Sequence, residues 1–436
     1  MDKQSKNDDV HGLITQALKY GPIDPLRKNG VLSYFKHALN VILARDKFAD
    51  LPGPISIQIE ATNHCNTRCA MCFRYLPASP KIDYLTVEEI KHVCIEARAL
   101  GTKTVVFSGG EPTTRDDDFI AMLINTKSID LSIGVLTNGL ALSDQMIATL
   151  VKTCSWVRVS VDAGKPETYE VVRGVKNGFD KVITNIKKLI ALRDKNSINK
   201  TKIGASITVQ RANINDVELF LKLGHSIGLD RIDIKFVHGH NSPVATKKQL
   251  SLLSDKFQKW IDKNSYPKAG IGWALFQLRG NLDGIANGLP AEQLYEMKNE
   301  YNCDLRVQNE CFAPYLTMII SPFGAVYPCC HLFEDNEGYW ESTEKRRSKY
   351  FIGSVREHTL KDIWIQYYKP FRQEAKTILT NVKSNSCGRC TRYSPHNIPL
   401  SRLYYLWRYA CALIGEENAY KVFSSFPCDD SNDVFI

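Results

Sequence analysis

The feature that most constrains the fold is a repeated alternation between short β-branched runs and longer amphipathic segments, which starts near Ile55 and occurs six times. The predicted strands are Ile55–Ala61, Thr104–Ser108, Ser132–Thr137, Trp156–Val161, Ile203–Val209 and Arg231–Val237. The amphipathic segments between them include Val87–Leu100, Asp144–Thr153, Phe179–Asp194 and Asn215–Ile227. Because helical crossovers connect parallel neighbours, the pattern predicts an α/β fold, a partial (β/α) barrel of six parallel strands.

Other parts of the chain surround this core, which spans residues 55–240. We expect a helical extension over 1–54, a helical bridge or insertion over 241–304, an auxiliary domain over 305–395 and an amphipathic tail over 396–436. Leu316–Ser321 and Ala325–Tyr327 flank Pro322-Phe323-Gly324, a turn sequence that predicts a β-hairpin. The auxiliary domain is therefore expected to be a small α+β unit built around that hairpin.

The chain contains 13 cysteines, and their meaning depends on the compartment. The N-terminus lacks the basic and apolar order of a secretory signal, and no stretch approaches 18 uninterrupted apolar residues. We therefore expect a cytoplasmic protein without a transmembrane segment, in which clustered thiols are metal ligands or catalytic groups more often than disulfides. The net charge of +9 is spread along the chain and fits an anionic substrate, an acidic electron-transfer partner or a generally basic surface; no nucleic-acid partner is expected.

Three thiols follow the first predicted strand directly, in Cys65-Asn66-Thr67-Arg68-Cys69-Ala70-Met71-Cys72. Thiolates are soft ligands that suit iron, and three of them leave one iron of a 4Fe-4S cluster open. The alternative is a structural zinc ion, which normally takes four closed ligands in paired CxxC-type arrangements. The CxxxCxxC spacing at the end of a first strand resembles the radical SAM superfamily, although Met71 stands where that superfamily often has an aromatic residue.

The resemblance implies that Cys65, Cys69 and Cys72 hold a 4Fe-4S cluster whose open iron binds S-adenosylmethionine (SAM) and cleaves it to a 5'-deoxyadenosyl radical. It also implies SAM contacts at the ends of later strands. The candidates are Gly109, Gly110, Glu111, Pro112, Asn138, Ser160, Asp162 and Arg173. The two glycines permit close backbone approach, Glu111 would receive the SAM ammonium group and Arg173 would clamp the carboxylate. For Asn138 and the residues after it, a turn cap or a fold-stabilising hydrogen bond is the alternative.

Further thiols in the C-terminal third suit a second metal group. Cys311 and Cys329 stand on either side of the predicted hairpin, Cys329 in a Gly-x4-Cys spacing from Gly324, and Cys387 and Cys390 form a CxxC pair. The arrangement resembles the twitch subdomain and the first half of the SPASM domain, which implies one auxiliary 4Fe-4S cluster. Cys330 or Cys303 stays open as a replacement ligand, and zinc stays open as the metal for four closed cysteines.

Four protein ligands would leave the auxiliary cluster no open iron, so we expect it to accept an electron from the substrate. With the resemblance, this implies an oxidoreductase that dehydrogenates a small sugar-like or other metabolite and uses a flavodoxin- or ferredoxin-like electron donor. Two alternatives stay open, a radical SAM enzyme that modifies a peptide and a non-catalytic iron–sulfur or zinc scaffold. His238 and His240, after the sixth strand, are candidates for a general base or polar anchor, with a surface-loop histidine pair as the alternative.

Overall fold

The computed structural model describes residues 51–72, 83–195, 201–237, 243–271, 274–275, 312–329, 351–375 and 407–425, together with residues 12, 40, 41, 43, 44 and 404. Its centre is a nine-stranded sheet in the order β6-β5-β4-β3-β2-β1-β7-β8-β9. The first six strands are β1 (Ser56–Glu60), β2 (Thr104–Ser108), β3 (Ser132–Thr137), β4 (Trp156–Ser160), β5 (Lys202–Val209) and β6 (Arg231–Phe236). Their pairings are all parallel, which confirms the predicted partial barrel, and each strand ends within one residue of its predicted limits.

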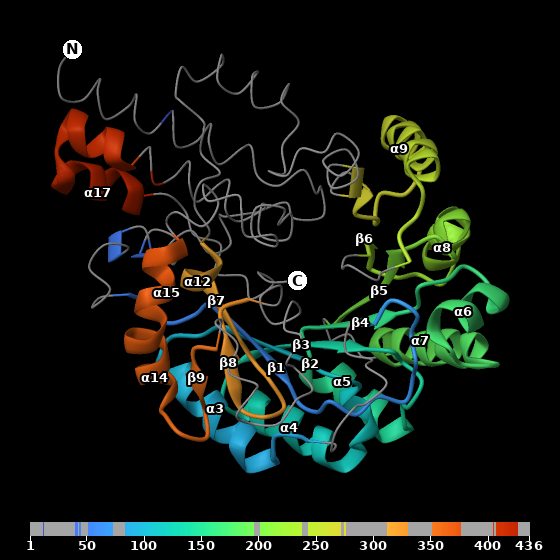
Figure 1. Ribbon diagram of the computed structural model, residues 1–436, viewed down its shortest axis with the longest axis horizontal. Helices are drawn as coiled ribbons and strands as arrows, with labels where there is room; N and C mark the ends of the chain where they lie inside the picture. Colours follow the sequence, from blue (N-terminus) through green and yellow to red (C-terminus); the bar gives the residue numbers. More distant parts are fainter. Residues whose placement is uncertain are drawn as a thin grey trace.

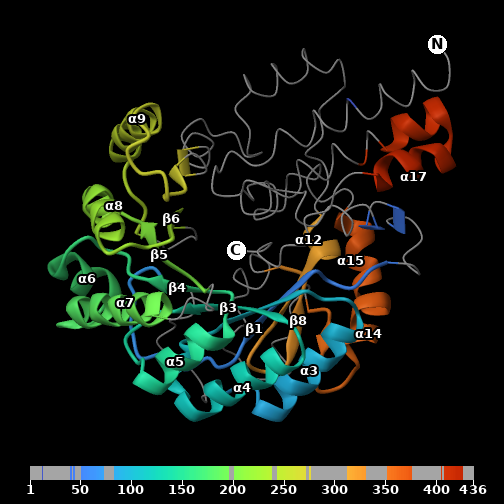
Figure 2. The same ribbon diagram turned by 180° about the vertical axis from the view of Figure 1, so that it is seen from behind.

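Helices connect these strands and lie against one face of the sheet (Figures 1 and 2). They are α3 (Val87–Ala99), α4 (Asp116–Ser128), α5 (Asp144–Thr153), α6 (Pro166–Arg173), α7 (Gly178–Lys195) and α8 (Val217–Ser226). The helix-facing side chains of the strands are apolar. Phe107 of β2 meets Phe119 of α4 edge to face with ring centroids 5.5 Å apart, and a Cβ at Gly224 of α8 would touch Ile232 of β6. Burial of these side chains supplies most of the driving force for folding.

The opposite face of the sheet, which we call the inner face, is polar. Register and the alternation of side chains place Gln58, Arg158, Ser160 and Asp233 there, because their neighbours along each strand face the helices. Arg158 Nη1 lies 3.1 Å from Asp233 Oδ2, and Arg231 Nε lies 2.7 Å from Asp233 Oδ1. Burial opposes ionisation of Asp233, but Arg231 and Arg158 outweigh it and hold the pKa of this carboxyl well below its usual range.

The predicted hairpin is present as β7 (Thr317–Ile320) and β8 (Ala325–Tyr327), which pair in antiparallel fashion. Its position adds a feature that the sequence did not predict: β7 pairs with β1 in parallel, so the hairpin extends the barrel sheet. The short strand β9 (Gly353–Ser354) completes this edge. The short helix α12 (Ala313–Leu316) precedes β7.

A helical segment after β9 packs beside α3 (Figure 1). It consists of α14 (Leu360–Asp362), the π-helical turn η4 (Ile363–Tyr367) and α15 (Tyr368–Ala375). The Leu360 amide donates to Glu96 Oε2 of α3 at 2.8 Å, and Trp364 Nε1 donates to the Pro52 carbonyl at 2.9 Å. These contacts fix this helical segment to the barrel.

Two further helices lie in the predicted bridge and tail, α9 (Lys247–Asp262) and α17 (Glu416–Ser424). In the tail, the Trp407 and Phe423 rings meet edge to face at 5.4 Å. The domain limits proposed from the sequence stay predictions. None of the helices among the described residues has the length and hydropathy that a membrane crossing requires.

The inner face is tightly packed at Gly134 of β3. A Cβ atom at this position would lie 2.0 Å from Cζ2 of Trp156 on β4. Gly134→Ala is therefore expected to lower the free energy of unfolding by about 1–3 kcal/mol through overpacking, measured by urea titration. In a Trp156→Leu background the same change should cost much less, and an equal cost in both backgrounds would contradict the steric explanation.

Candidate active site

The three predicted cluster ligands lie on one loop, residues 62–72, which follows the carboxyl end of β1 and which we call the cysteine loop. Cys65, Cys69 and Cys72 are each partly exposed. The buried Thr67 hydroxyl lies 3.2 Å from Cys65 Sγ and 3.4 Å from Cys69 Sγ, and the Cys72 amide donates to the Cys69 carbonyl at 3.0 Å. The loop backbone therefore gathers the three thiols around a single turn.

Gly109 and Gly110 support the start of this loop. The Gly110 amide donates to the Thr62 carbonyl and the Glu111 amide donates to the His64 carbonyl, both at 2.7 Å. A Cβ at Gly109 would lie 2.4 Å from the Thr62 carbonyl oxygen, and one at Gly110 would lie 2.1 Å from that of His64. The glycines permit close backbone approach, as predicted, and here the neighbour that they admit is the cysteine loop itself.

Glu111 is buried and surrounded by donors. Its Oε1 accepts from the Thr113 amide at 3.2 Å, the Thr113 hydroxyl at 2.7 Å and the Thr137 hydroxyl at 2.7 Å, and its Oε2 accepts from the Asn138 amide at 2.6 Å. Burial raises the pKa of Glu111, and these four donors act against that rise. Four hydrogen bonds use most of the acceptor capacity of a carboxylate. The structure thus gives Glu111 a bracing role between β2 and β3, and its contact with the SAM ammonium group stays a prediction.

Pro112 and Asn138 continue this bracing. Pro112 is the first residue of the 3₁₀ turn η2 (Pro112–Thr114). The ring of proline fixes its φ at a value that suits this position. Asn138 Nδ2 donates to Asn66 Oδ1 of the cysteine loop at 2.6 Å, while Asn138 Oδ1 accepts from the Leu140 amide at 2.9 Å. The turn-cap alternative for Asn138 is therefore present in the structure together with a link to the loop.

Asp162 and Arg173 form a buried ion pair beside the cysteine loop, with Arg173 Nη1 2.8 Å from Asp162 Oδ2. Asp162 has a φ of +61°, and its Oδ1 accepts from the Thr208 amide at 2.6 Å. The carbonyl of Arg173 accepts from the Arg68 amide at 3.3 Å, so the end of α6 holds the middle of the loop. Gly174, with a φ of +68°, ends α6, and a Cβ there would lie 2.7 Å from the Arg68 carbonyl oxygen.

Burial and the charge of Arg173 act in opposite directions on the Cys69 thiol. Burial raises the pKa of Cys69 to about 11, and the positive charge of Arg173 is the largest effect that opposes this rise. Burial of Arg173 is outweighed by Cys69 and Asp162, so the pKa of this guanidinium is raised and it stays charged. Because metal ligation requires the thiolate, a fixed cation beside Cys69 lowers the cost of deprotonation.

The residues present fit an iron–sulfur cluster with SAM. Two buried polar atoms around the cysteine loop, Arg173 Nε and Gln210 Oε1, have no hydrogen-bond partner in the described structure. Tyr169 interacts electrostatically with Arg173 and Cys69, and Gln210 Nε2 lies 3.5 Å from Met71 Sδ. Buried polar atoms without partners indicate a missing ligand or water.

Among the described residues, no three His, Cys, Asp or Glu side chains converge closely enough to hold one ion. A four-iron cube binds each thiolate at a different corner, so its ligands need not converge on one point. The spacing of Cys65, Cys69 and Cys72 along the loop is compatible with such a cube.

Cys329 is the predicted auxiliary ligand that the structure describes, and it is 8% exposed. It lies two residues beyond Tyr327, which pairs with Ile319 of the antiparallel strand β7, so the chain runs here toward Thr317. Thr317 pairs with Ser56 at the start of β1. Cys329 and the cysteine loop therefore lie toward opposite ends of β1, which spans about 16 Å at 3.3 Å per residue.

The other predicted residues divide in two groups. Ser160 ends β4 on the inner face and is partly exposed. The remaining candidates lie outside the described residues, so their roles stay predictions: Cys311, Cys387, Cys390, the alternatives Cys303 and Cys330, and His238 and His240.

Two family matches fall on the regions that contain these sites. Residues 59–224 match the radical SAM superfamily, and residues 311–391 match an iron–sulfur cluster-binding domain, SPASM. The chain therefore carries a radical SAM domain followed by a SPASM domain. The first domain implies a 4Fe-4S cluster and SAM as cofactors, and the second implies auxiliary iron–sulfur binding, as expected from the cysteine spacing.

The chain is similar to named radical SAM proteins over different lengths. It is 26% identical over 340 residues to the tungsten-containing aldehyde ferredoxin oxidoreductase cofactor-modifying protein of Pyrococcus furiosus, a match that covers 77% of this chain and 86% of that protein. It is 30% identical over 169 residues to the GTP 3',8-cyclase of Haemophilus influenzae, covering 38% of this chain and 48% of the cyclase. The match thus spans about half the length of the cyclase.

Solved structures show the same fold. Streptococcus suis SuiB bound to the precursor peptide SuiA superposes with a TM-score of 0.54 at 19% identity, covering 77% of this chain and 70% of SuiB. Native anSMEcpe with bound AdoMet superposes with a TM-score of 0.52 at 14% identity, covering 85% of this chain and 99% of anSMEcpe. At these identities the likeness establishes the architecture.

Proposed function

We propose that this radical SAM enzyme is an oxidoreductase that dehydrogenates a small metabolite, with the auxiliary cluster as acceptor of the substrate electron. The observation that supports this proposal most strongly is the placement of Cys329 and the cysteine loop toward opposite ends of β1. On the inner face of the sheet, Gln58 of β1 donates to Ser108 of β2 in the stretch between these two ends. A substrate bound there would lie between the two cysteine sites.

Cys65, Cys69 and Cys72 would hold the catalytic cluster, and Arg173 would orient the carboxylate of SAM. Cluster and SAM, when bound, supply a carbon radical that removes a hydrogen atom from the substrate. The 2.8 Å contact with Asp162 fixes the orientation of the Arg173 guanidinium. The N–H of Arg173 Nε, which has no partner in the described structure, therefore points in a fixed direction. The bracing of the loop by Gly110 and Glu111 keeps the thiols at the carboxyl end of β1.

The inner face favours a polar substrate. Arg158, Arg231 and Asp233 line it as a fixed network, and Gln58 Nε2 donates to Ser108 Oγ at 2.9 Å on the same face. Hydroxyl or carboxylate groups of a metabolite would find further donors and acceptors on these side chains, and an apolar substrate would take up none of them. The relative that matches along 86% of its own length is named as a cofactor-modifying protein, which agrees with a small-molecule substrate.

The electron donor and the compartment belong to the same proposal. A flavodoxin- or ferredoxin-like protein would supply the first electron, in the cytoplasm. Peptide modification is the competing function, and it predicts a mass change in a peptide instead of a metabolite. A scaffold without catalysis predicts bound cofactor without release of 5'-deoxyadenosine.

The test is a metabolite screen with anaerobically reconstituted enzyme and SAM. For a dehydrogenation, the substrate loses one hydrogen atom to the deoxyadenosyl carbon, then one electron and one proton, while cleavage of SAM consumes one electron. A product two hydrogens lighter than its substrate should therefore form in equal amounts with 5'-deoxyadenosine. In the proposed cycle the auxiliary cluster returns the substrate electron to the catalytic cluster, so the external reductant should be needed only to start the reaction. Formation of an isomer, or of a modified peptide alone, would overturn the proposed dehydrogenation.

A further inference from the structure

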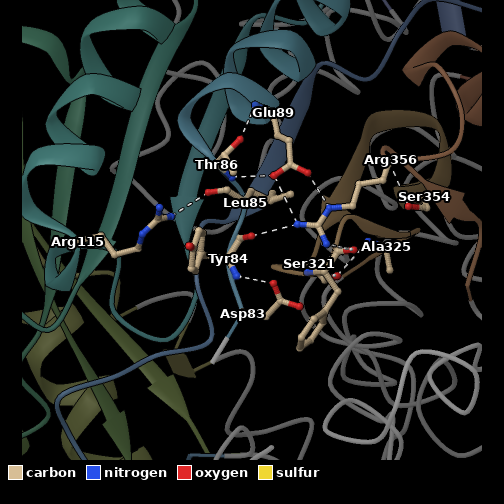
Figure 3. Close-up of polar contacts among 11 residues, drawn as sticks. Asp83, Tyr84, Leu85, Thr86, Glu89, Arg115, Ser321, Ala325, Ser354 and Arg356 are labelled. Atoms are coloured by element: carbon tan, nitrogen blue, oxygen red, sulfur yellow. Dashed lines mark hydrogen bonds and ion pairs between the residues drawn. The ribbon is translucent and has the colours of Figure 1, made fainter. Parts of the chain in front are cut away.

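Arg356 connects three segments of the molecule that are far apart in sequence (Figure 3). Its Nε donates to Glu89 Oε1 of α3 at 2.7 Å, its Nη2 donates to the Tyr84 carbonyl at 3.1 Å, and its Nη1 donates to the Phe323 carbonyl at 3.4 Å. Phe323 lies in the turn between β7 and β8. One guanidinium thus contacts α3, the segment before α3 and the hairpin turn with three different nitrogens.

The carboxylate that receives Arg356 is itself fixed. Glu89 forms a capping box at the start of α3, in which the Thr86 amide donates to Glu89 Oε2 at 2.7 Å and the Glu89 amide donates to Thr86 Oγ1 at 3.1 Å. The side chains of Arg356 and Glu89 are 38% and 29% exposed, so the ion pair by itself adds little to global stability. The importance of Arg356 is that the same guanidinium also binds the backbone carbonyls of Tyr84 and Phe323.

The segment that Arg356 holds is the base of the cysteine loop. Tyr84 forms an antiparallel bridge with Thr62, the Asn63 amide donates to the Asp83 carbonyl at 3.2 Å, and the Leu85 amide donates to the Ala61 carbonyl at 3.1 Å. These bonds lie immediately before Cys65. A displacement of Tyr84 would therefore displace the backbone next to Cys65.

The hairpin turn that Arg356 contacts leads to Cys329, and Gly324 explains how the contact is possible. Gly324 has a φ of +80°, and a Cβ there would lie 3.1 Å from Arg356 Cγ and 3.2 Å from Arg356 Cδ. The absence of a side chain lets the Arg356 stem cross the turn. The glycine of the Gly-x4-Cys spacing thus has a physical reason that does not involve a metal.

We propose that Arg356 is a positioning residue that couples the hairpin carrying Cys329 to the base of the cysteine loop, so that a change at one cysteine site alters the backbone at the other. This inference rests on the proposed role of both sites in holding clusters. Other contacts dock the same C-terminal segment, including Leu360 with Glu96 and Trp364 with Pro52, so loss of Arg356 leaves the docking in place.

The first arm of the test measures hydrogen exchange of the Asn63 and Leu85 amides by mass spectrometry in the reconstituted enzyme. Arg356→Gln and Glu89→Gln should each speed exchange of these amides by about tenfold, with little further effect in the double variant. Arg98→Gln is the matched control. Arg98 lies on α3, as Glu89 does, but its ion pair is with the exposed Asp130 and not with Arg356. Unchanged exchange in Arg356→Gln, or equal acceleration in Arg98→Gln, would overturn the inference.

The second arm tests coupling, which a purely structural contact would not produce. Cys329→Ala should alter the exchange of Asn63 and Leu85 and the EPR spectrum of the reduced, SAM-bound catalytic cluster when Arg356 is present. In the Arg356→Gln background the same substitution should change neither. Equal effects of Cys329→Ala in both backgrounds, or no effect in either, would refute the coupling. Because exchange does not depend on turnover, this result is distinguishable from a failure of the proposed dehydrogenation.

Discussion

Replacing Cys65, Cys69 or Cys72 by alanine is expected to reduce the release of 5'-deoxyadenosine from SAM to background. Each thiol lies on the same short loop, and each would bind a different iron of the cluster. With only two protein ligands the cluster would be lost or bound weakly. The measurement is anaerobic chromatography of 5'-deoxyadenosine, together with iron content and EPR of the reduced protein.

Cys94→Ala is the matched control for these substitutions. Cys94 is a fully buried thiol on α3 that lies 3.5 Å from Thr126 Oγ1, and burial raises its pKa to about 12, so it is an inert core thiol. Its loss should cost stability by leaving a small cavity, while SAM cleavage in the folded fraction stays unchanged. Full cleavage by Cys72→Ala, or loss of cleavage in Cys94→Ala, would refute the assignment of the three ligands.

The strands could be predicted because their signal is local. Each strand contains β-branched or aromatic residues that face the helices and are buried, and residues such as Val105 and Phe107 carry that signal without reference to the rest of the chain. The pairing of β7 with β1 could not be predicted in this way, because Ser56 and Thr317 are neighbours in the sheet but the other five parallel strands lie between them in the sequence. Helices α4 and α6 were not named from the sequence. Helix α6 has only eight residues, whereas the three aspartates that open α4 are an ordinary signal for the start of a helix.

The candidate site shows the same division. The cysteine spacing and the two glycines are contiguous motifs, so the sequence showed them directly. Thr67, Tyr169 and Gln210 were missed, because only folding places their side chains beside the thiols. The interpretation of Glu111 as a direct SAM contact relied on its motif alone, whereas its four donors come from η2 and the end of β3.

Glu111→Gln is expected to be the most damaging isosteric change next to the cysteine loop. Each carboxylate oxygen accepts from a backbone amide, Oε1 from Thr113 and Oε2 from Asn138. A glutamine has one NH₂ group in place of one oxygen, so in either orientation a donor faces a backbone N–H that cannot rotate away. One buried N–H then loses its acceptor, which costs about 1–3 kcal/mol and more where the lost acceptor was charged.

The consequence should reach the thiols, because the Glu111 amide also holds the His64 carbonyl at 2.7 Å, one residue before Cys65. We expect urea titration of Glu111→Gln to show a loss of at least about 2 kcal/mol, and SAM cleavage per folded molecule to fall by about tenfold or more. Glu167→Gln, an exposed change on α6, should stay within about 0.5 kcal/mol of wild type. If the two variants have the same free energy of unfolding and the same SAM cleavage per folded molecule, Glu111 does not brace the loop. A large loss of both in Glu111→Gln alone would mean that this carboxylate helps to fix the position of Cys65.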